Sequence, residues 1–375
     1  MIYDNIPKNK NIVVALEPYF NISFIQGPRV EISNAGGSKF NVVFRDKNTQ
    51  EVAHTGTIGN NSWIKANKRY YIEWEVLIND VQYEFSFEGK RVYISLDSSS
   101  LGDMLAWFPY VDEFRKRHNC KVVCSTFANE LFQENYPEIE FVKPGSVVNN
   151  ILAMYNIGWF YNDDGSVDLF RNPIDFKTEP LQKTASNILG LDYQEVKPKL
   201  LLPQPNKKNQ VCIGIHATTQ AKYWNNKNGW QKVVNYIKSR GYEVILLSRE
   251  GDGYMGNWHP QGVVKHPEGS LSDVIMTLRE SKLFVGIGSG LSWLSWACEV
   301  PTVIISGFSE PYTEPQSGVV RIEAPVGACR GCFNKHRLDA GDWNWCPEHK
   351  GTDRQFECTK LLEGEDVIEK IKCLL

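Results

Sequence analysis

The cysteines near the end of the chain have the spacing of a metal site. Cys329 and Cys332 form a C-x-x-C pair, and Cys346 and Cys358 follow after 13 and 11 intervening residues. Four thiolates in two approximate pairs can surround one ion tetrahedrally, which suits zinc or iron. The segment between them is rich in Gly, Asp, Lys and Trp and has little apolar periodicity. A bound metal would supply the core that this segment lacks.

The residues alone leave the metal and its chemistry open. Zinc ranks ahead of iron, because closed four-cysteine sites usually hold zinc. His336 and His349 lie in the same segment, and we interpret them as solvated loop residues because the cysteines already complete a tetrahedron. A redox-active or catalytic thiol is the weaker alternative, since the cluster follows the last expected sheet strand and does not lie on a strand-to-helix turn.

A carboxylate lies on a turn that joins an expected strand to an expected helix. The stretch DSSSLGD runs from Asp97 to Asp103. Ser99 or Ser100 can cap the helix, and Gly102 permits close approach to the backbone. One interpretation is that Asp103 complements the helix dipole. The functional interpretation is a general base presented at a cleft.

A later loop has the composition of a phosphate site. The stretch HATTQAKYW follows an expected strand and contains Thr218, Thr219 and Lys222. Hydroxyl donors and one compact cation suit a phosphate group. A solvated loop explains this composition about as well when the loop is considered alone.

The stretch GIGSGLSW is a glycine-rich strand-to-helix turn. Such a turn exposes unpaired N–H groups at a helix N-terminus, here at Ser289, Gly290, Leu291 and Ser292, and these groups can bind an anion. The turn does not match the dinucleotide fingerprint, and a lone glycine-rich turn is a weak signal. The combination of a carboxylate loop on one domain with two anion loops on another is more informative, because it predicts a cleft for an anionic substrate.

These loops require a frame of two α/β domains. Residues 1–90 alternate apolar and polar positions and predict a small β-sandwich or barrel. Strand and helix patterns then alternate over 91–200 and again over 201–325, which predicts two doubly wound, Rossmann-like domains separated by the Pro-rich linker Val196–Gln210. Residues 326–375 are expected to hold the four-cysteine segment and a C-terminal helix. Ligands of such domains bind at the carboxyl ends of the strands.

Composition excludes several classes of protein. The chain has 375 residues, 23% of them charged, and a net charge of −3. It therefore offers no basic footprint for nucleic acid. No stretch approaches the roughly 20 apolar residues that a membrane span needs. The N-terminus has no basic segment followed by an apolar one. We therefore expect a cytoplasmic protein, in which thiols stay reduced and a cysteine cluster favours metal over disulfides.

The loops together resemble the heptosyltransferases of the GT-B glycosyltransferase class, which transfer heptose from ADP-heptose. The stretch SLGD matches the family's Ser-x-Gly-Asp turn, in which the aspartate is the catalytic base, and Lys222 matches its strand-end lysine. The stretch GSGLSW matches the family's Asp-Thr-Gly-Leu-Ser-His motif with two departures. Gly288 replaces the aspartate and Trp293 replaces the histidine.

One subset, the bacterial autotransporter heptosyltransferases, resembles nearly the whole chain. Its members have an N-terminal β-domain, a GSGLSWL turn and a C-terminal four-cysteine iron motif. The resemblance implies one iron per chain at the four cysteines, with zinc as the alternative, and no catalytic divalent metal. It also implies inverting transfer of heptose from ADP-heptose to serines of an autotransporter adhesin. A homo-oligomer is expected, with a dodecameric ring as the candidate assembly.

On this interpretation each loop has a role in the reaction. Asp103 takes the proton from the acceptor hydroxyl. Lys222, Thr218, Thr219 and the helix start at residues 289–292 hold the diphosphate, so that fixed donors and a cation stabilise the leaving group. Ser248 and Arg249, in the loop SREGDG after the next strand, are the candidates for nucleoside contacts.

Other functions stay open at this point. Within the enzyme class, the donor could be another nucleotide sugar, such as a hexose or UDP donor, or the acceptor could be of the lipopolysaccharide type. A non-catalytic nucleotide- or carbohydrate-binding adaptor would keep the cleft without needing Asp103. A metal-sensing protein would make the cysteines primary.

Overall fold

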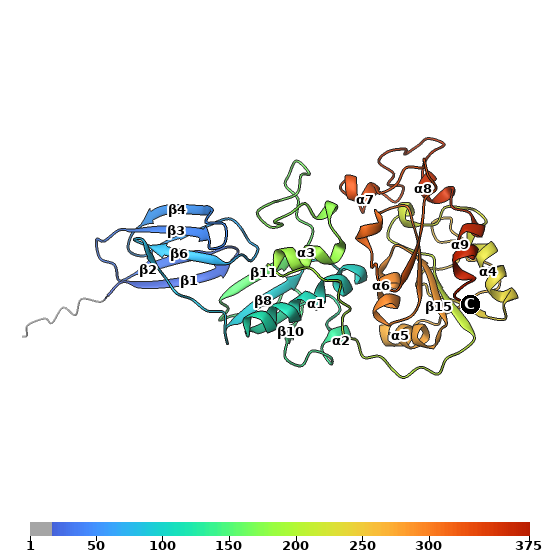
Figure 1. Cartoon of the computed structure of the whole chain (residues 1–375), viewed down its shortest axis with the longest axis horizontal. Coiled ribbons are helices and arrows are strands. Elements are labelled where there is room, and N and C mark those ends of the chain that lie inside the picture. Colours follow the sequence, from blue (N-terminus) through green and yellow to red (C-terminus); the bar gives the residue numbers. More distant parts are fainter. Residues whose placement is uncertain (1–16) are drawn as a thin grey trace, which may run out of the picture.

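The computed structural model describes residues 17–375, so the first 16 residues of the expected β-domain lie outside the described residues. The described chain forms three blocks in a row, a β-rich block followed by two α/β blocks (Figure 1). The cysteine segment lies on the last of these blocks, and its helix α7 (Cys332–Lys335) is directed toward the middle one.

Alternating apolar residues build two sheets in the first block. An antiparallel sheet has the order β4-β3-β6-β7, with bounds β3 (Phe40–Asp46), β4 (Val52–Ile58), β6 (Trp74–Ile78) and β7 (Val81–Gln82). A second antiparallel ribbon consists of β1 (Tyr19–Ile25), β2 (Arg29–Ser33) and β5 (Ser62–Lys65). The rings of Phe20 and Phe40, one from each sheet, lie 5.2 Å apart and join the two layers.

The first block shares a sheet with the second. Strand β1 pairs in parallel with β11, so that Phe24 lies opposite Ala153. The resulting seven-stranded sheet has the order β10-β9-β8-β11-β1-β2-β5. Its other strands are β8 (Arg91–Leu96), β9 (Lys121–Ser125), β10 (Glu140–Val142) and β11 (Ala153–Ile157). The domain boundary near residue 90 stays a prediction, and this sheet crosses it.

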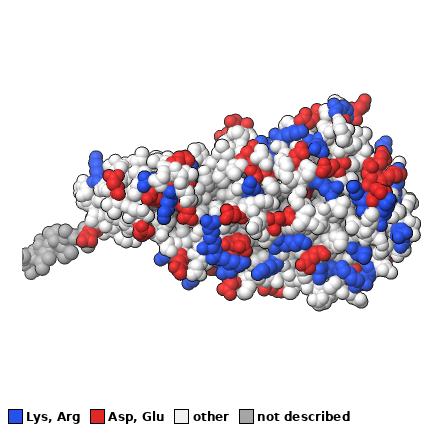
Figure 2. All heavy atoms as spheres, in the orientation of Figure 1, with Lys and Arg blue, Asp and Glu red and all other residues white. Residues whose placement is uncertain are grey.

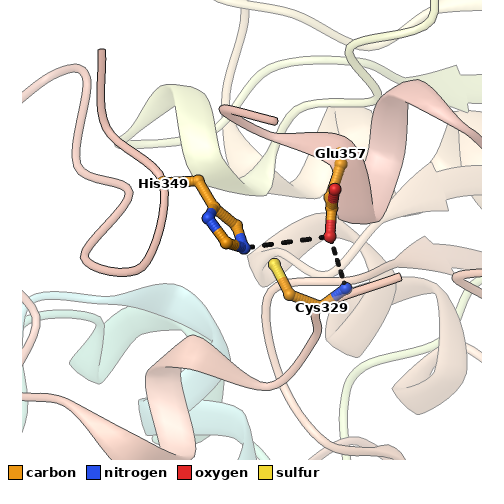
Figure 3. Close-up of side chains that lie close together, drawn as sticks. All are labelled: Cys329, His349 and Glu357. Atoms are coloured by element: carbon orange, nitrogen blue, oxygen red, sulfur yellow. Dashed lines mark hydrogen bonds and ion pairs between the residues drawn. The ribbon is translucent and has the colours of Figure 1, made fainter. Parts of the chain in front are cut away.

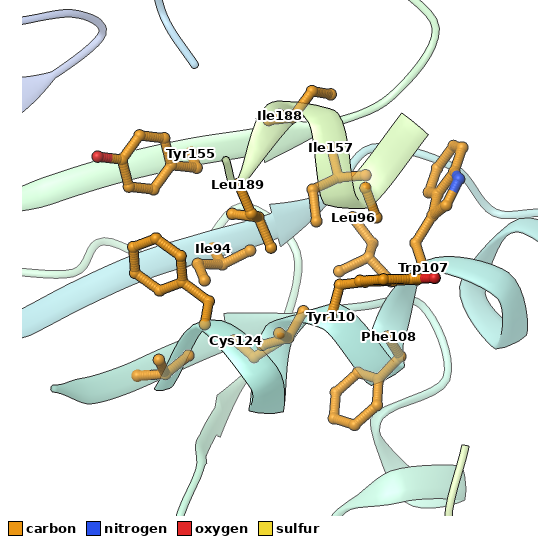
Figure 4. Close-up of a cluster of buried hydrophobic side chains, with 14 of the residues drawn as sticks. Ile94, Leu96, Trp107, Phe108, Tyr110, Cys124, Tyr155, Ile157, Ile188 and Leu189 are labelled. Atoms are coloured by element: carbon orange, nitrogen blue, oxygen red, sulfur yellow. The ribbon is translucent and has the colours of Figure 1, made fainter. Parts of the chain in front are cut away.

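The middle block buries its core between this sheet and three helices, of which α1 is the longest. These helices are α1 (Leu101–His118), α2 (Asn129–Phe132) and α3 (Leu181–Ile188). Figure 4 shows Ile94 and Leu96 of β8 beside Trp107 and Tyr110 of α1, and all four are buried. Ser100 occupies the N-cap position of α1, although its side chain makes no capping hydrogen bond. This packing fixes the start of α1, where Asp103 lies.

The third block is a six-stranded parallel sheet with the order β14-β13-β12-β15-β16-β17. Its strands are β12 (Gln210–Gly214), β13 (Glu243–Leu246), β14 (Val264–Lys265), β15 (Leu283–Ile287), β16 (Thr302–Ser306) and β17 (Val319–Glu323). Its helices are α4 (Gly229–Ser239), α5 (Leu271–Glu280), α6 (Gly290–Ala297) and α9 (Gly364–Ile371). The fold is therefore the GT-B type pair of Rossmann-like domains that the sequence predicts, with a β-rich part before it and a cysteine-rich part after it.

Two further features concern the surface. Among residues 17–375, no helix is long and apolar enough to cross a membrane. On the face shown in Figure 2, basic and acidic side chains are interspersed over all three blocks. That face therefore carries no broad basic patch of the kind that binds nucleic acid.

Candidate active site and cysteine segment

Asp103 lies in the first turn of α1 and accepts two hydrogen bonds on one oxygen. The Ser98 hydroxyl donates to Asp103 Oδ2 at 2.6 Å, and the Trp159 indole N–H donates to the same oxygen at 3.2 Å. Burial raises the pKa of the Asp103 carboxyl, and the two donors and Lys222 partly offset that effect. A half-buried carboxylate with a raised pKa and fixed orientation suits a general base.

Lys222 approaches this carboxylate from the other domain. It ends the short helix η2 (Gln220–Lys222), which follows β12, and its ammonium lies 5.1 Å from the centroid of the Phe308 ring. Burial lowers the pKa of Lys222, and the charge of Asp103 raises it. Since each charge acts on the pKa of the other, the predicted base and the predicted cation lie near one another.

The glycine-rich turn lies against the start of α1. A Cβ on Gly290 would lie 2.9 Å from Leu101 Cβ and 3.2 Å from the Gly102 backbone nitrogen. Ser289 is the N-cap of α6, and its hydroxyl is buried with no hydrogen-bond partner in the described chain. The N-terminus of α6 therefore opens beside Asp103 with a polar group available for a ligand, and Leu291 is half-buried there.

Two of the expected donor-binding hydroxyls already bond the chain's own backbone. Ser292 is buried, and its hydroxyl donates to Ile287 O at 2.6 Å. Thr219 is also buried, and its hydroxyl donates to Trp343 O at 3.2 Å. Both hydroxyls thus support the local backbone, and the donor-binding roles of Thr219 and Ser292 stay predictions. Thr218 is exposed and stays a candidate.

The expected nucleoside loop follows β13. The Ser248 hydroxyl lies 2.6 Å from His216 Nδ1 and accepts the Glu250 N–H at 3.0 Å, while Arg249 is exposed. Burial lowers the pKa of His216 to about 4, so this imidazole is neutral at pH 7. The loop region thus offers a neutral imidazole, a hydroxyl and an exposed guanidinium, which are compatible with nucleoside binding. The roles of Ser248 and Arg249 stay predictions.

A buried ion pair explains why residue 288 of the glycine-rich turn is a glycine. A Cβ on Gly288 would lie 2.7 Å from Glu314 Oε1. That carboxylate accepts the Ser309 hydroxyl at 2.5 Å and forms an ion pair with Arg321. Sequence reasoning missed Glu314 and Arg321, because nothing in their local sequence marks them as neighbours of the turn.

The four cysteines of the segment are free thiols, and most of them are buried. Cys332, Cys346 and Cys358 are buried and Cys329 is half-buried. A hydrogen bond with Cys358 lowers the pKa of the Cys329 thiol to about 6, and the same bond raises the pKa of Cys358. The charges of Cys332 and Cys346 also raise the pKa of Cys358, so the thiols act on one another. A closed shell of four thiolates around one metal stays a prediction.

His349 lies closer to the cysteines than expected. The ligand atoms of Cys329, His349 and Glu357 all lie within 4.8 Å of one another (Figure 3). Glu357 accepts the Cys329 backbone N–H at 2.8 Å and pairs with Arg354. The interpretation of His349 as a solvated loop residue is therefore corrected. His336, in contrast, pairs with Glu348 at the surface, 2.8 Å away.

The cysteine segment is also joined to the Lys222 loop. The Gln220 N–H donates to Trp343 O at 3.0 Å, which adds to the Thr219 bond to the same carbonyl. Asn225 donates to the Thr359 hydroxyl at 2.9 Å. The residues around the thiols therefore hold the loop that carries the candidate cation.

Comparison with known proteins places this arrangement in a family. Residues 165–328 match the family model of glycosyltransferase family 9 (heptosyltransferase). The autotransporter heptosyltransferase Aah of Escherichia coli is 38% identical over 330 residues, which cover 83% of each chain. The chain belongs to the autotransporter heptosyltransferases. A second relative, BimC of Burkholderia thailandensis, is 29% identical over 77% of this chain and 70% of its own, and is described as inactive.

A crystal structure of TibC from enterotoxigenic E. coli H10407 supports the same membership. It superposes with a TM-score of 0.85 at 32% identity and covers 95% of each chain. TibC is described there as an iron-containing dodecameric glycosyltransferase, and a further structure shows it in complex with ADP-D-beta-D-heptose. Because one relative in the family is described as inactive, membership alone does not make this chain an active enzyme. Its activity depends on the residues of its own site.

Proposed function

We propose that this chain is an active glycosyltransferase that transfers heptose from ADP-heptose to serine side chains of an autotransporter protein. The observation that carries the proposal is the juxtaposition of Asp103 and Lys222 from the two Rossmann-like domains, beside the N-terminus of α6. A base, a cation and a helix N-terminus are the groups that a metal-independent sugar transfer from a nucleoside diphosphate needs.

The geometry suggests an inverting displacement. The carboxylate of Asp103 takes the proton of the acceptor serine hydroxyl while that oxygen attacks the anomeric carbon. The bond from this carbon to the ADP oxygen breaks on the opposite face. Lys222, the Ser289 hydroxyl and the first N–H groups of α6 stabilise the charge that develops on the diphosphate. The Thr218 hydroxyl adds a further candidate contact.

The four cysteines would hold iron in a closed thiolate shell, with zinc as the alternative. Support comes from the hydrogen bond between the thiols of Cys329 and Cys358 and from the iron described in TibC. Bound metal would cross-link a segment with little apolar core of its own, and the segment in turn holds the Lys222 loop. We also propose assembly as a homo-oligomer, as described for TibC, and action in the cytoplasm before the acceptor is exported.

The proposal is tested by mass spectrometry of an autotransporter passenger expressed together with this chain. The expected result is a mass increase of one heptose per modified serine, which disappears in cells that cannot make ADP-heptose. An unmodified passenger beside a folded, ADP-binding protein would instead group this chain with inactive relatives. A hexose adduct would overturn the choice of donor.

A further inference from the structure

Trp159 is a neighbour of the candidate base that the sequence analysis did not identify. Strands β8 and β11 are parallel, and Leu96 lies opposite Ile157 in their register. Ser98 and Trp159 each lie two residues beyond these partners, at the same edge of the sheet. Both side chains donate to Asp103 Oδ2, at 2.6 and 3.2 Å. The sheet register therefore brings two donors to one oxygen.

The indole of Trp159 is fixed by rings from both domains. Phe176 packs edge-on against it at 4.6 Å between centroids, within the middle block. Phe333 also packs edge-on against it, at 5.4 Å between centroids, and it comes from α7 of the cysteine segment. Phe333 directly follows Cys332, one of the candidate metal ligands.

Phe333 also contacts the ring that supports the cation. Its centroid lies 5.2 Å from that of Phe308, and its backbone N–H donates to Phe308 O at 3.0 Å. The ammonium of Lys222 lies 5.1 Å from the same Phe308 ring. The Phe333 ring thus contacts both the ring that donates to the candidate base and the ring that lies beside the candidate cation.

Helix α7 is held to the middle block by further bonds. The Asn334 amide donates to Lys177 O at 2.8 Å, and the Arg337 guanidinium lies 4.8 Å from the Tyr161 ring centroid. The Tyr312 hydroxyl donates to the same Lys177 carbonyl at 3.0 Å. These contacts cross between the two Rossmann-like domains, so α7 and its neighbours help to fix how the domains meet.

We propose that Trp159 and Phe333 are positioning residues, through which the C-x-x-C turn of the cysteine segment holds Asp103 and Lys222 in register between the two domains. This inference rests on the proposed function, since it assumes that Asp103 is the base. Trp159 orients the carboxylate through its N–H. Phe333 fixes Trp159 and, through Phe308, the surface on which Lys222 lies.

The decisive variant is Trp159→Phe, which keeps an aromatic ring and removes the donor. Loss of one hydrogen bond to a charged group predicts a fall in kcat of about ten- to a hundred-fold, with KM for the donor sugar and ADP affinity near wild type. The acid limb of the kcat–pH profile should move to higher pH, because the lost N–H stabilised the carboxylate. This variant leaves Lys222 in place, which is the charged group that lowers the pKa of Asp103 among the described residues. Trp63→Phe, which removes an exposed indole in the β-rich block, is the matched control and should behave as wild type.

A second variant tests the route through the cysteine segment. Phe333→Leu should lower kcat while metal content and ADP affinity are retained, and Phe333→Tyr, which keeps the ring, should restore most of the rate. Lys335→Ala, an exposed residue of the same helix, is the matched control. If Phe333→Leu lost its metal, the result with Trp159→Phe would decide whether the positioning role holds, because Trp159 lies outside the cysteine segment.

The outcomes separate the inference from the proposed function. If Asp103→Asn is inactive and Trp159→Phe keeps both the wild-type kcat and an unshifted acid limb, the positioning role is wrong and the base assignment stands. If Asp103→Asn itself transfers heptose at the wild-type rate, the proposed mechanism fails first. A fall in kcat and a shifted acid limb in Trp159→Phe, together with ring-dependent rescue at residue 333, supports the inference.

Discussion

Gly102 and Gly290 bring the two Rossmann-like domains into backbone contact at the candidate active site. A Cβ on Gly102 would lie 3.6 Å from Gly290 Cα, and a Cβ on Gly290 would lie 3.2 Å from Gly102 N. The two motifs that carry the resemblance to heptosyltransferases, SLGD and GSGLSW, therefore touch each other. Glycine at both positions allows the N-termini of α1 and α6 to approach each other closely.

A first prediction follows for Gly290→Ala. Its new methyl group would lie 2.9 Å from Leu101 Cβ, so the two helix starts would have to separate. We expect a lower kcat and a loss of stability of about 1 to 3 kcal/mol, the usual cost of overpacking. Gly37→Ala is the control, because nothing lies within 4 Å of the added Cβ. Equal rates and melting temperatures for both variants would contradict the tight contact.

Asp103→Asn removes the candidate base while preserving the size of the side chain. We expect transfer to fall by about 10² to 10⁴-fold, the usual contribution of a general base, while ADP affinity is retained. Single-turnover transfer measured with purified protein and acceptor provides the test. Asp80→Asn, on an exposed turn of the β-rich block, should be unaffected. Near wild-type transfer by a folded Asp103→Asn protein would remove Asp103 from the mechanism.

Ser98→Ala gives a prediction for pH dependence. The Ser98 hydroxyl lowers the pKa of Asp103, and burial raises it. Removing the hydroxyl therefore raises this pKa further. Because the base acts in its deprotonated form, the acid limb of kcat should move to higher pH, while the rate well above the limb falls less. A profile measured with Lys222 intact that keeps the wild-type limb would contradict this assignment.

Lys222→Ala tests the diphosphate site. A charge-assisted contact is worth about 1.5 to 3 kcal/mol, so ADP should bind more weakly by roughly 10- to 150-fold in calorimetric titration. The acid limb of kcat should also rise, because the charge of Lys222 lowers the pKa of Asp103. Lys227→Ala, on an exposed position five residues later, is the matched control. Unchanged ADP affinity and turnover in Lys222→Ala would move the phosphate site elsewhere.

The cysteine segment gives a prediction with two arms. Cys358→Ser should lower metal content and soluble yield, because Cys358 is buried among the other thiols. His349→Ala should keep one metal per chain if the four cysteines complete the shell, although His349 lies beside Cys329. Elemental analysis also distinguishes iron from zinc. A metal-free but folded and active wild-type preparation would contradict a structural metal, and metal loss in His349→Ala would add a fifth residue to the site.

Strong local patterns explain why the main elements were predictable. The apolar face of α1 and the buried runs of β12, β15 and β16 led to the correct Rossmann-like pair, and the loops at their ends contain Asp103, Lys222 and Ser289. Strand β11 was missed, although its residues alternate between buried and half-buried positions. Trp159 was missed for the same reason, because its position opposite Ser98 follows from the parallel register of β8 and β11.

Hydroxyl side chains were the least predictable part of the site. Thr219 and Ser292 have the right residue type and lie on the right loops, yet both bond the chain's own backbone. The partner of Thr219 lies 124 residues away, beyond any local pattern. Glu314 and Arg321 were missed for a similar reason, because the space under Gly288 is determined by tertiary packing.

The pairing of β1 with β11 has a consequence for the order of folding. Phe24 emerges from the ribosome long before its partner Ala153 has been synthesised. At roughly 5 to 20 residues per second, one edge of β1 stays unpaired for many seconds, and long-range strand pairing of this kind is slow to form. A nascent chain arrested before β11 should therefore be more sensitive to protease in its first strands than one arrested after it.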